Sequence, residues 1–269
     1  MRCNSRPART TRIRSNAITM SSEGWHIYDC PIEGEPRRLK TVTTPAQARK
    51  SKRYYPSVTG VLGLLPNPFI QKWRGRKLLE LREQHPDVDV EQLEEMAWGM
   101  RTCPATGEQI PSSDFGTAAH SAIENYFANG GQGGCAYWDT ATATIDYLED
   151  NFTFRAAESI LVCHALRIAG TVDYIGKDQA GNWMLADFKF RAKNNTYDKD
   201  LAQLAVEARM LRDDYELDYD PDIYSIVVVD GVPHPKKWSD KMKAKGLQIA
   251  STAANLYWSL PGYGYEPNS

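Results

Sequence analysis

The fold is decided by residues 168–190, which read IAGTVDYIGKDQAGNWMLADFKF. Two runs rich in β-branched and aromatic residues, 168–175 and 183–190, flank the turn sequence GKDQAG at 176–181. Glycines at both ends of a short polar segment between two such runs are typical of a hairpin turn. The stretch therefore predicts two antiparallel strands, and the remaining elements are assigned outward from them.

Three charged residues lie within this apolar hairpin: Asp173 on its first strand, and Asp187 and Lys189 on its second. Side chains alternate along a strand with a period of two, so Asp187 and Lys189 share one face. The other face carries Ala186, Phe188 and Phe190. The turn brings Asp173 opposite the neighbourhood of Asp187, within about two positions of register. Two carboxylates and one ammonium are expected to converge.

Burying such groups is costly unless they pair or bind a cation. Mg²⁺ prefers one or two carboxylates together with waters and substrate phosphate. A lysine beside the metal can orient or deprotonate the attacking water and stabilise charge in the transition state. The pattern therefore predicts phosphodiester hydrolysis by Asp173, Asp187 and Lys189. The alternative is a surface salt bridge at a solvated edge of the sheet.

The elements around the hairpin follow from periodicity and capping signals. Strands are expected at 159–163 and 224–229, and amphipathic helices at 198–213 and 239–258. Two helices precede them, one over 115–128 capped by Asp114 and one over 138–151. A meander, a crossover helix and a further strand give an α/β fold of the α+β type, with a mixed sheet and helices packed on it.

Three domains or segments are expected. Residues 1–23 form a basic arm, which can equally be a transit peptide or an extension upstream of a start at Met20. Residues 24–113 hold strands or loops and an N-terminal helical annex, and 114–269 hold the catalytic core. Within the annex we expect helices over 58–65 (with Ser57 as N-cap), 69–83 and 90–100, then a loop at 101–113.

Two helices carry further polar candidates. His120 and Glu124 are four residues apart and project from one helix face, where His120 can ligate metal or orient phosphate. Glu124 can hydrogen-bond His120 or ligate metal through water. A structural role is the alternative for such a histidine. Gln203 interrupts the apolar face of the helix after the hairpin and can hold the nucleophilic water or a base edge.

Four motifs occur in the order seen in RecB-like nucleases of the PD-(D/E)xK superfamily, namely GTAAH (116–120), GTVD (170–173), DFK (187–189) and QL (203–204). Upstream, YPSVT (55–59) resembles a segment of the mitochondrial genome maintenance exonuclease and its phage relatives. The resemblance covers about residues 54–230. It is carried by the order and spacing of the motifs, since each is weak alone.

The resemblance implies an αβββαβ core of the restriction-endonuclease-like type, Mg²⁺ or Mn²⁺ as cofactor, and DNA as substrate. It makes His120, Asp173 and Asp187 the metal ligands. Asp173, Asp187, Lys189 and Gln203 become the catalytic set. Glu158 is a weaker candidate, at the start of the first strand.

The sequence departs from the family at two points. The tyrosine that often follows the family's glutamine by four residues is replaced here by Glu207. Some relatives hold an iron–sulfur cluster with one early and three C-terminal cysteines, but no cysteine follows Cys163 in this sequence, so no such cluster is expected. The five cysteines form no CxxC pair, which favours a reducing compartment. No nucleotide-binding motif is present, so unwinding of duplex DNA would need a helicase partner.

Charge is segregated although the net charge is only −2. Residues 36–53 carry seven Lys or Arg residues and no acid, and aromatic residues are interleaved with basic ones over 49–77. This mixture suits single-stranded nucleic acid, although solvated helix faces are the alternative. The candidate DNA contacts are Tyr55, Ser57, Thr59, Trp73, Arg74, Arg191 and Lys193.

The sequence thus predicts a metal-dependent DNA exonuclease that acts on single strands or exposed ends in recombination, repair or replication. A structure-specific endonuclease and a non-catalytic DNA-binding recombination accessory protein are the alternatives. A single-strand annealing protein is a further possible partner. No apolar run approaches the roughly 20 residues that a membrane span needs. A cytoplasmic location is expected, and a mitochondrial one remains open because of the arginine-rich N-terminus.

Overall fold

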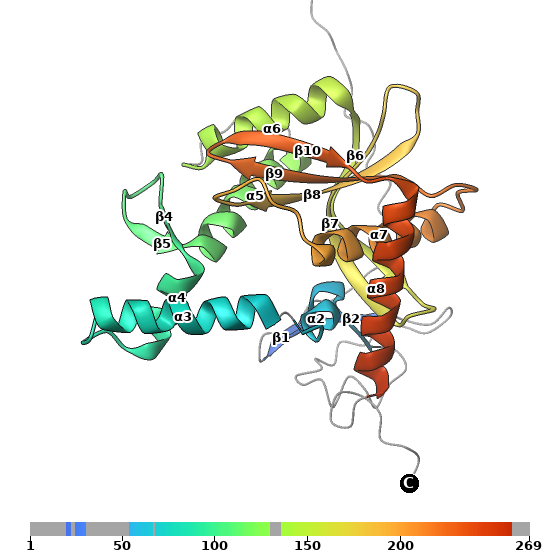
Figure 1. Cartoon of the computed structure of the whole chain (residues 1–269). Coiled ribbons are helices and arrows are strands. Elements are labelled where there is room, and N and C mark those ends of the chain that lie inside the picture. The colour runs from blue at the N-terminus through green and yellow to red at the C-terminus, as the bar shows by residue number, and fades with distance from the viewer. Residues whose placement is uncertain (1–19, 23–24, 31–53, 67, 130–135, 260–269) are drawn as a thin grey trace, which may run out of the picture.

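The structure is a computed structural model that describes residues 20–22, 25–30, 54–66, 68–129 and 136–259. Its centre is a five-stranded sheet in the order β10-β9-β8-β7-β6 (Figure 1). The strands are β6 (Thr153–Cys163), β7 (Ile168–Lys177), β8 (Trp183–Phe190), β9 (Asp222–Val229) and β10 (Val232–Lys237). All neighbours are antiparallel except β8 and β9, which run parallel. The expected mixed sheet with packed helices is confirmed.

Helices cover both faces of this sheet (Figure 1). One face packs against α5 (Ser112–Asn129) and α6 (Trp138–Asn151) through a cluster rich in aromatic residues. The other packs against α7 (Asp198–Asp214) and α8 (Asp240–Ser259) through a mainly aliphatic cluster. A Cβ added to Gly246 of α8 would lie 2.7 Å from the carbonyl oxygen of Leu201, so the two helices approach each other closely at this glycine.

The N-terminal region is divided differently from the expected annex. A small sheet of β1 (Met20–Ser22), β2 (Trp25–Asp29) and β3 (Tyr54–Pro56) leads into α2 (Val58–Gly63). The side chains of Val58, Val61 and Leu62 are buried in the same cluster as α7 and α8. Helix α2 therefore belongs to the main core, and a boundary at residue 113 is wrong for this segment.

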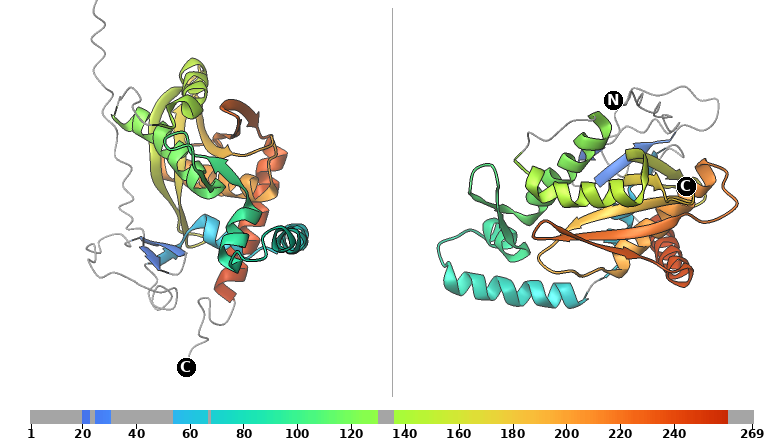
Figure 2. Two further views of the ribbon diagram at one scale, coloured as in Figure 1. Left: turned by 90° about the vertical axis from the view of Figure 1, so that its left-hand side faces the viewer. Right: turned by 90° about the horizontal axis from the view of Figure 1, so that it is seen from above.

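The part of the chain that projects from the body, among the described residues, consists of α3 (Pro68–Gln84), α4 (Val90–Trp98) and the hairpin of β4 (Met100–Thr102) with β5 (Gln109–Pro111) (Figures 1 and 2). We call these elements the arm. It has a small apolar cluster of its own, with Leu81, Leu93 and Ala97 at its centre. The loop expected at 101–113 is wrong, because this segment contains the β4–β5 hairpin and the start of α5.

Several other boundaries differ from expectation. Helix α5 begins at Ser112, so Asp114 lies in its first turn rather than at its cap. Strand β6 begins six residues earlier than expected. Strand β10 was missed because it contains Pro233 and Pro235, and proline is tolerated in a sheet chiefly at an edge, where β10 lies.

Some expectations fall outside the described residues. They include residues 1–19 of the expected basic N-terminal segment and the whole basic stretch at 36–53. Met20–Ser22 forms strand β1 and pairs with β2. These three residues therefore belong to the small sheet and not to the expected basic N-terminal segment of 1–23. Within the described part of the chain, no helix is long and apolar enough to cross a bilayer.

Candidate metal centre and active site

The site lies where β7 and β8 separate. Their backbone pairing runs from Lys177↔Trp183 to Tyr174↔Ala186 and then stops. At the next position the Asp173 carboxylate accepts a hydrogen bond from the Phe188 backbone N–H at 2.8 Å. A side chain thus takes the place of the missing backbone partner.

Strand β7 also changes face at this point. Val172 packs with the cluster beneath α7 and α8, whereas Tyr174 packs with the cluster beneath α5 and α6. Residues two apart on a regular strand would share a face. The strand therefore bends at Asp173, and the bend carries this carboxylate towards α5.

Glu158 lies opposite Asp173 on the neighbouring strand. Its neighbours Ala157 and Ser159 pair with Tyr174 and Val172, so Glu158 is the partner position of Asp173. The Glu158 backbone has φ +45°, in the left-handed region that non-glycine residues rarely adopt. Such a conformation costs about 1–3 kcal/mol and is found most often at functional sites. Strand β6 thus bends beside the bend of β7.

Helix α5 adds His120. Its Nδ1 lies 3.4 Å from Asp173 Oδ2, and its ring packs on Phe188 and Phe190 at centroid distances of 5.9 and 5.4 Å. Each of His120, Glu158 and Asp173 offers one ligand atom, and these atoms all lie within 4.8 Å of one another. Glu158, the weaker candidate in sequence, therefore joins the central cluster. Its pKa is raised to about 7 by burial and by the nearby carboxylates of Asp173 and Glu124.

Asp187 and Lys189 form an ion pair beside this cluster, in which Asp187 is buried and Lys189 is partly exposed. Lys189 Nζ donates to Asp187 Oδ1 at 2.5 Å, and Asp187 is only 1% exposed. Burial lowers the pKa of Lys189, but the carboxylates of Asp187 and Asp173 outweigh it, and the net shift is upward. Asp187 Oδ2 is buried and has no hydrogen-bond partner among the described residues. The expected separation of faces is confirmed, because Phe188 packs on the opposite side of β8.

Helix α7 contributes Gln203 and, one turn later, Glu207. Gln203 Nε2 donates to Glu207 Oε1 at 3.2 Å. Glu207 is 1% exposed, and burial raises its pKa well above its usual value, with Asp187 and Asp173 adding to the rise. The residue one turn after the candidate glutamine thus carries a buried carboxyl group that contacts it.

One cleft of about 610 Å³ brings these groups together. Its walls include every residue expected to be catalytic or to bind metal, together with the two glutamates expected to assist the metal. These residues are His120, Glu124, Glu158, Asp173, Asp187, Lys189 and Gln203. The first turns of α5 add Ser112, Ser113, Gly116 and Thr117, and β7 adds Thr171. Gly116 and Thr117 belong to the GTAAH motif and Thr171 to the GTVD motif, but the sequence indicated no catalytic or binding role for them. Ser112 and Ser113 were missed because the start of α5 was placed too late.

The candidate DNA contacts are dispersed. Tyr55 is 5% exposed, and its hydroxyl lies 3.1 Å from His164 Nδ1, so the structure buries the ring that was expected to stack on a base. Ser57 caps α2 by accepting from the Gly60 N–H at 3.0 Å, as expected, and is buried. Thr59 is exposed and lines the cleft.

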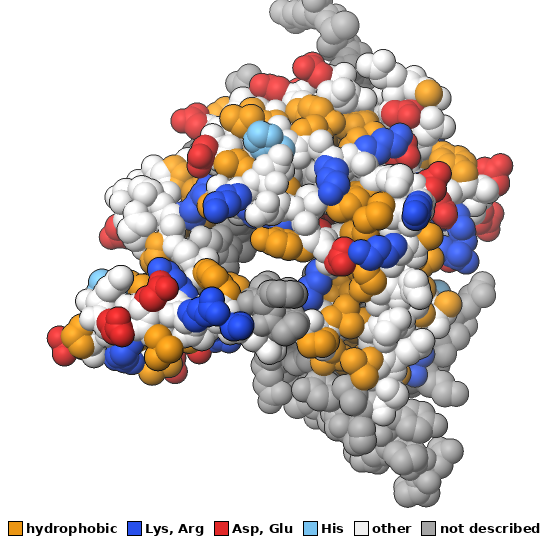
Figure 3. All heavy atoms as spheres, in the orientation of Figure 1, with side chains coloured by type: hydrophobic (Ala, Val, Ile, Leu, Met, Phe, Trp, Pro, Cys, Tyr) orange, Lys and Arg blue, Asp and Glu red, His pale blue; other side chains and the backbone are white. Residues whose placement is uncertain are grey.

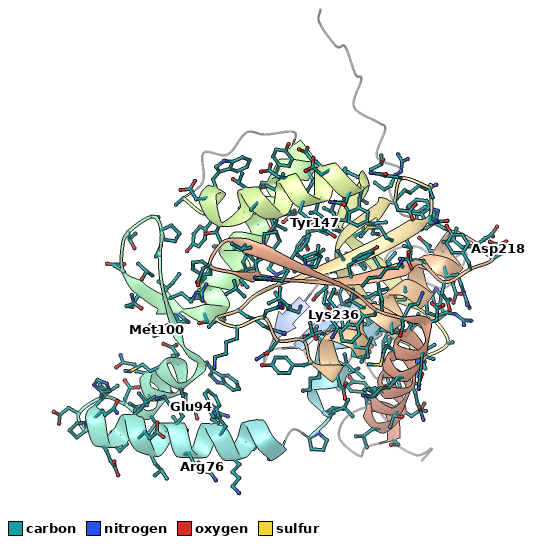
Figure 4. All side chains as sticks on the ribbon, turned by 45° about the horizontal axis from the view of Figure 1, so that its top comes forward. Arg76, Glu94, Met100, Tyr147, Asp218 and Lys236 are labelled. Carbon is teal, nitrogen blue, oxygen red and sulfur yellow. The ribbon has the colours of Figure 1, made fainter. Side chains whose placement is uncertain are left out.

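The remaining DNA-contact candidates do not line the cleft. Trp73 is 47% exposed and lies 6.1 Å from the Trp98 ring, while Arg74 pairs with Glu94 at 2.6 Å. Arg191 forms a two-pronged ion pair with Asp200, with both distances 2.8 Å. Lys193 is exposed. Figure 4 labels Arg76 on α3, within the arm that projects from the body.

Neither known protein families nor curated proteins yield a match to this sequence. Among solved structures, the fold is similar to the crystal structure of SSO0001, with 11% sequence identity and a TM-score of 0.33. The similarity covers 68% of this chain and 71% of that one. A likeness this weak carries no argument about the fold or the site.

Proposed function

We propose that the protein is a divalent-metal-dependent deoxyribonuclease that hydrolyses phosphodiester bonds at DNA strand ends. The observation that supports this most is the convergence of His120, Glu158 and Asp173 with the Asp187–Lys189 pair in a single cleft. These groups come from one helix and three adjacent strands. The resemblance to PD-(D/E)xK nucleases, based on the same residues, supports the same chemistry.

The residues of the cleft fit a hard divalent cation. Asp187 Oδ2 is buried without a partner among the described residues, and the pKa of Glu158 is raised by burial and then by the neighbouring carboxylates of Asp173 and Glu124. Mg²⁺ favours carboxylate oxygens, and an imidazole in the set also suits Mn²⁺ and later transition metals. His120, Glu158 and Asp173 would hold the ion, and Asp187, the ligand expected from the sequence, has its Oδ2 unpaired and could join them. When bound, it would polarise the phosphoryl oxygen and activate a water molecule.

The protein's own groups would stabilise the developing charge. Lys189 keeps its proton because its pKa is raised, so we assign it hydrogen-bond donation to a phosphate oxygen and not removal of a proton from water. Asp187 fixes the position of that ammonium. The Phe188 N–H fixes the Asp173 carboxylate in the same way. Gln203 lines the cleft, where its amide can orient water.

Action on strand ends is supported by the shape of the molecule. Figure 3 shows Lys and Arg side chains on the arm and on the body, on both sides of the hollow between them. The exposed Trp73 and Trp98 rings of the arm offer stacking surfaces for unpaired bases. A single strand could thus reach the cleft past the arm. We place this activity in the cytoplasm or in mitochondria, in recombination, repair or replication of DNA.

The test is incubation of end-labelled single- and double-stranded DNA, linear and circular, with Mg²⁺, Mn²⁺ or EDTA. Wild type is compared with Asp187→Ala and Lys189→Ala, and with Asp146→Asn as a matched control, because Asp146 is exposed on α6 and outside the cleft. We expect metal-dependent shortening of linear DNA by wild type and the control only.

Three outcomes would change the assignment. Cleavage of circular single strands would replace an exonuclease by an endonuclease. DNA binding with no metal-dependent cleavage would favour the accessory-protein alternative. Equal cleavage by wild type and Lys189→Ala would contradict the proposed site.

A further inference from the structure

Two tryptophan side chains are exposed next to each other on the arm. Trp73 of α3 is 47% exposed and Trp98 of α4 is 53% exposed, and their ring centroids are 6.1 Å apart. Neither ring belongs to the apolar cluster of the arm, which has Leu81, Leu93 and Ala97 at its centre. We call the two rings the aromatic platform. It presents apolar surface that the described part of the arm does not use for its own packing.

An ion pair holds the platform in place. Arg74, next to Trp73 on α3, pairs with Glu94 of α4 at 2.6 Å. The guanidinium carbon of Arg74 also lies 5.7 Å from the centroid of the Trp98 ring. The pair therefore joins α3 to α4 at the level of the platform. A surface that is held on rigid elements loses less conformational freedom when a ligand binds to it.

The platform lies close to the cleft. Trp98 is followed by Gly99, whose carbonyl oxygen accepts hydrogen bonds from the Ser112 N–H at 3.0 Å and from the Ser112 hydroxyl at 2.8 Å. Ser112 is part of the cleft wall. Consecutive Cα atoms are only about 3.8 Å apart, so one residue and one hydrogen-bonded contact separate Trp98 from that wall. A strand that contacts the platform and the cleft at the same time needs to span only a few nucleotides.

Charge is divided along the length of the arm. Residues 68–77, at the end of α3 nearer the body (Figure 1), contain four Lys or Arg residues and no acid, whereas residues 80–95 contain seven acids. Lys72 and Arg76 are exposed on either side of Trp73 in the sequence. Figure 3 shows hydrophobic and basic side chains together on the arm. This distribution favours an anionic ligand at the platform and disfavours one farther along the arm.

A single nucleic-acid strand meets both requirements of this surface. Its bases stack on aromatic rings while its phosphates meet nearby cations. Bases inside a duplex are stacked on one another, so a duplex offers free faces only at its terminal pairs. An unpaired strand offers the face of every base.

We propose that the aromatic platform binds unpaired nucleobases, so that the arm selects DNA with a single-stranded end and holds the strand a few nucleotides from the cleft. This inference rests on the proposed nuclease function and specifies the form of its substrate. Trp73 and Trp98 lie outside the cleft, so they are positioning residues that touch none of the reacting atoms.

The test measures binding in EDTA by fluorescence anisotropy. The ligands are a labelled single strand, the same sequence as a blunt duplex, and a strand of abasic residues that keeps the phosphates and lacks the bases. Wild type is compared with Trp73→Ala and Trp98→Ala. Leu79→Ala is the matched control, because Leu79 is also an exposed apolar residue of α3 but lies six residues from Trp73 and thus on another face of the helix.

Wild type should bind the single strand about 10-fold more tightly than either other ligand. Each Trp→Ala variant should weaken binding of the single strand about 10-fold, the effect of losing one stacked base, and should leave binding of the abasic strand unchanged. Leu79→Ala should bind all three ligands as wild type does. Trp73→Phe and Trp98→Phe cover the case in which an alanine variant folds poorly, and they should retain most of the affinity because each keeps a ring.

Strand length gives a second measurement. The affinity of wild type should rise in a step once the strand is long enough to reach from the cleft to the platform, and the alanine variants should lack this step. In cleavage assays with Mg²⁺, the alanine variants should show KM raised about 10-fold on single strands with kcat unchanged, because the platform does not contact the reacting atoms.

The outcomes separate the platform from the nuclease. Binding of single strands that depends on both rings, without cleavage in Mg²⁺, would keep the platform and refute the nuclease. Metal-dependent cleavage with the same affinity and KM in wild type and the alanine variants would refute the platform and keep the nuclease. Equal weakening of normal and abasic strands would overturn base stacking. Self-association of wild type that is lost in Trp73→Ala would show that the surface binds a second copy of the chain, and would also overturn the proposal.

Discussion

The two ends of the β7–β8 hairpin are built on opposite principles. At the turn end the backbones pair continuously, and the side chains of Ile175, Met184 and Leu185 are fully buried among apolar neighbours. At the other end the pairing stops, and the space holds Asp173 and Asp187. In this one hairpin, the turn end therefore contributes mainly to stability, and the open end holds the candidate catalytic groups.

The apolar end of the hairpin makes the buried charged groups at the other end tolerable. Each fully buried large apolar side chain stabilises the fold by about 1.5–3 kcal/mol, while an unpaired buried polar group costs a similar amount. The paired end therefore offsets the strain and unpaired atoms at Glu158, Asp187 and Glu207. The comparison predicts that substitutions at the two ends will have opposite profiles of activity and stability.

The largest effect is expected at the open end. Asp173→Asn should lower the rate of DNA cleavage by about 10³-fold, because it removes a charge from the metal cluster and weakens the acceptor of the Phe188 N–H. The free energy of unfolding of the metal-free protein should be unchanged or higher, since a repulsion with Glu158 is removed. Single-turnover cleavage and urea unfolding measure both quantities. Activity above a tenth of wild type would contradict the assignment.

The turn end should give the reverse result. Met184→Ala removes a side chain that is 0% exposed and should lower the free energy of unfolding by about 2–5 kcal/mol. The cleavage rate per folded molecule should stay within about two-fold of wild type. Chemical unfolding, with kinetics measured well below the unfolding midpoint, tests this. A large loss of rate in folded Met184→Ala would show that the two ends are not separable.

A smaller effect should distinguish two basic residues that follow β8. Arg191 is held by Asp200 at the start of α7, so Arg191→Ala should destabilise the fold by about 1.5–3 kcal/mol. Lys193 is exposed, and Lys193→Ala should leave stability unchanged but reduce the salt dependence of DNA binding by about one phosphate contact. Fluorescence anisotropy over a salt series reports the second. An unchanged salt slope for Lys193→Ala would remove it from the DNA contacts.

The smallest expected effect is on the pH dependence of stability. The pKa of Glu158 in the folded protein is about 7, above its usual value of 4.5, so its stabilising contribution is complete below pH 4.5 and is lost as pH rises through 7. The metal-free wild type should therefore lose stability relative to Glu158→Gln across this window. Thermal unfolding at closely spaced pH values measures the difference, and added Mg²⁺ should reduce it. Parallel curves for the two proteins would contradict the cause given for the shift.

Regular periodicity explains which parts of the site could be predicted. Asp187 and Lys189 lie on a regular strand, so alternation fixed their common face. His120 and Glu124 lie on a regular helix and were placed by the spacing of one turn. Glu158 could not be placed with the same confidence, because its left-handed backbone breaks the alternation on which the argument depends.

The fold shows the same limit. The sheet and its covering helices follow local patterns, but the membership of α2 in the main core depends on contacts with α7 and α8, which are far away in sequence. Tyr55 illustrates the consequence. Its place among basic residues suggested a DNA contact, whereas the tertiary structure packs it against Tyr28 and Ala169. The buried Glu207 was visible only as a departure from a family pattern.

The proposed metal site can be located by anomalous diffraction from crystals soaked in Mn²⁺. We expect an ion coordinated by His120, Glu158 and Asp173, beside the Asp187–Lys189 pair, and no ion in Asp173→Asn crystals. A cleft with no ion at saturating Mn²⁺, or an ion bound only elsewhere on the protein, would contradict the proposed metal ligands.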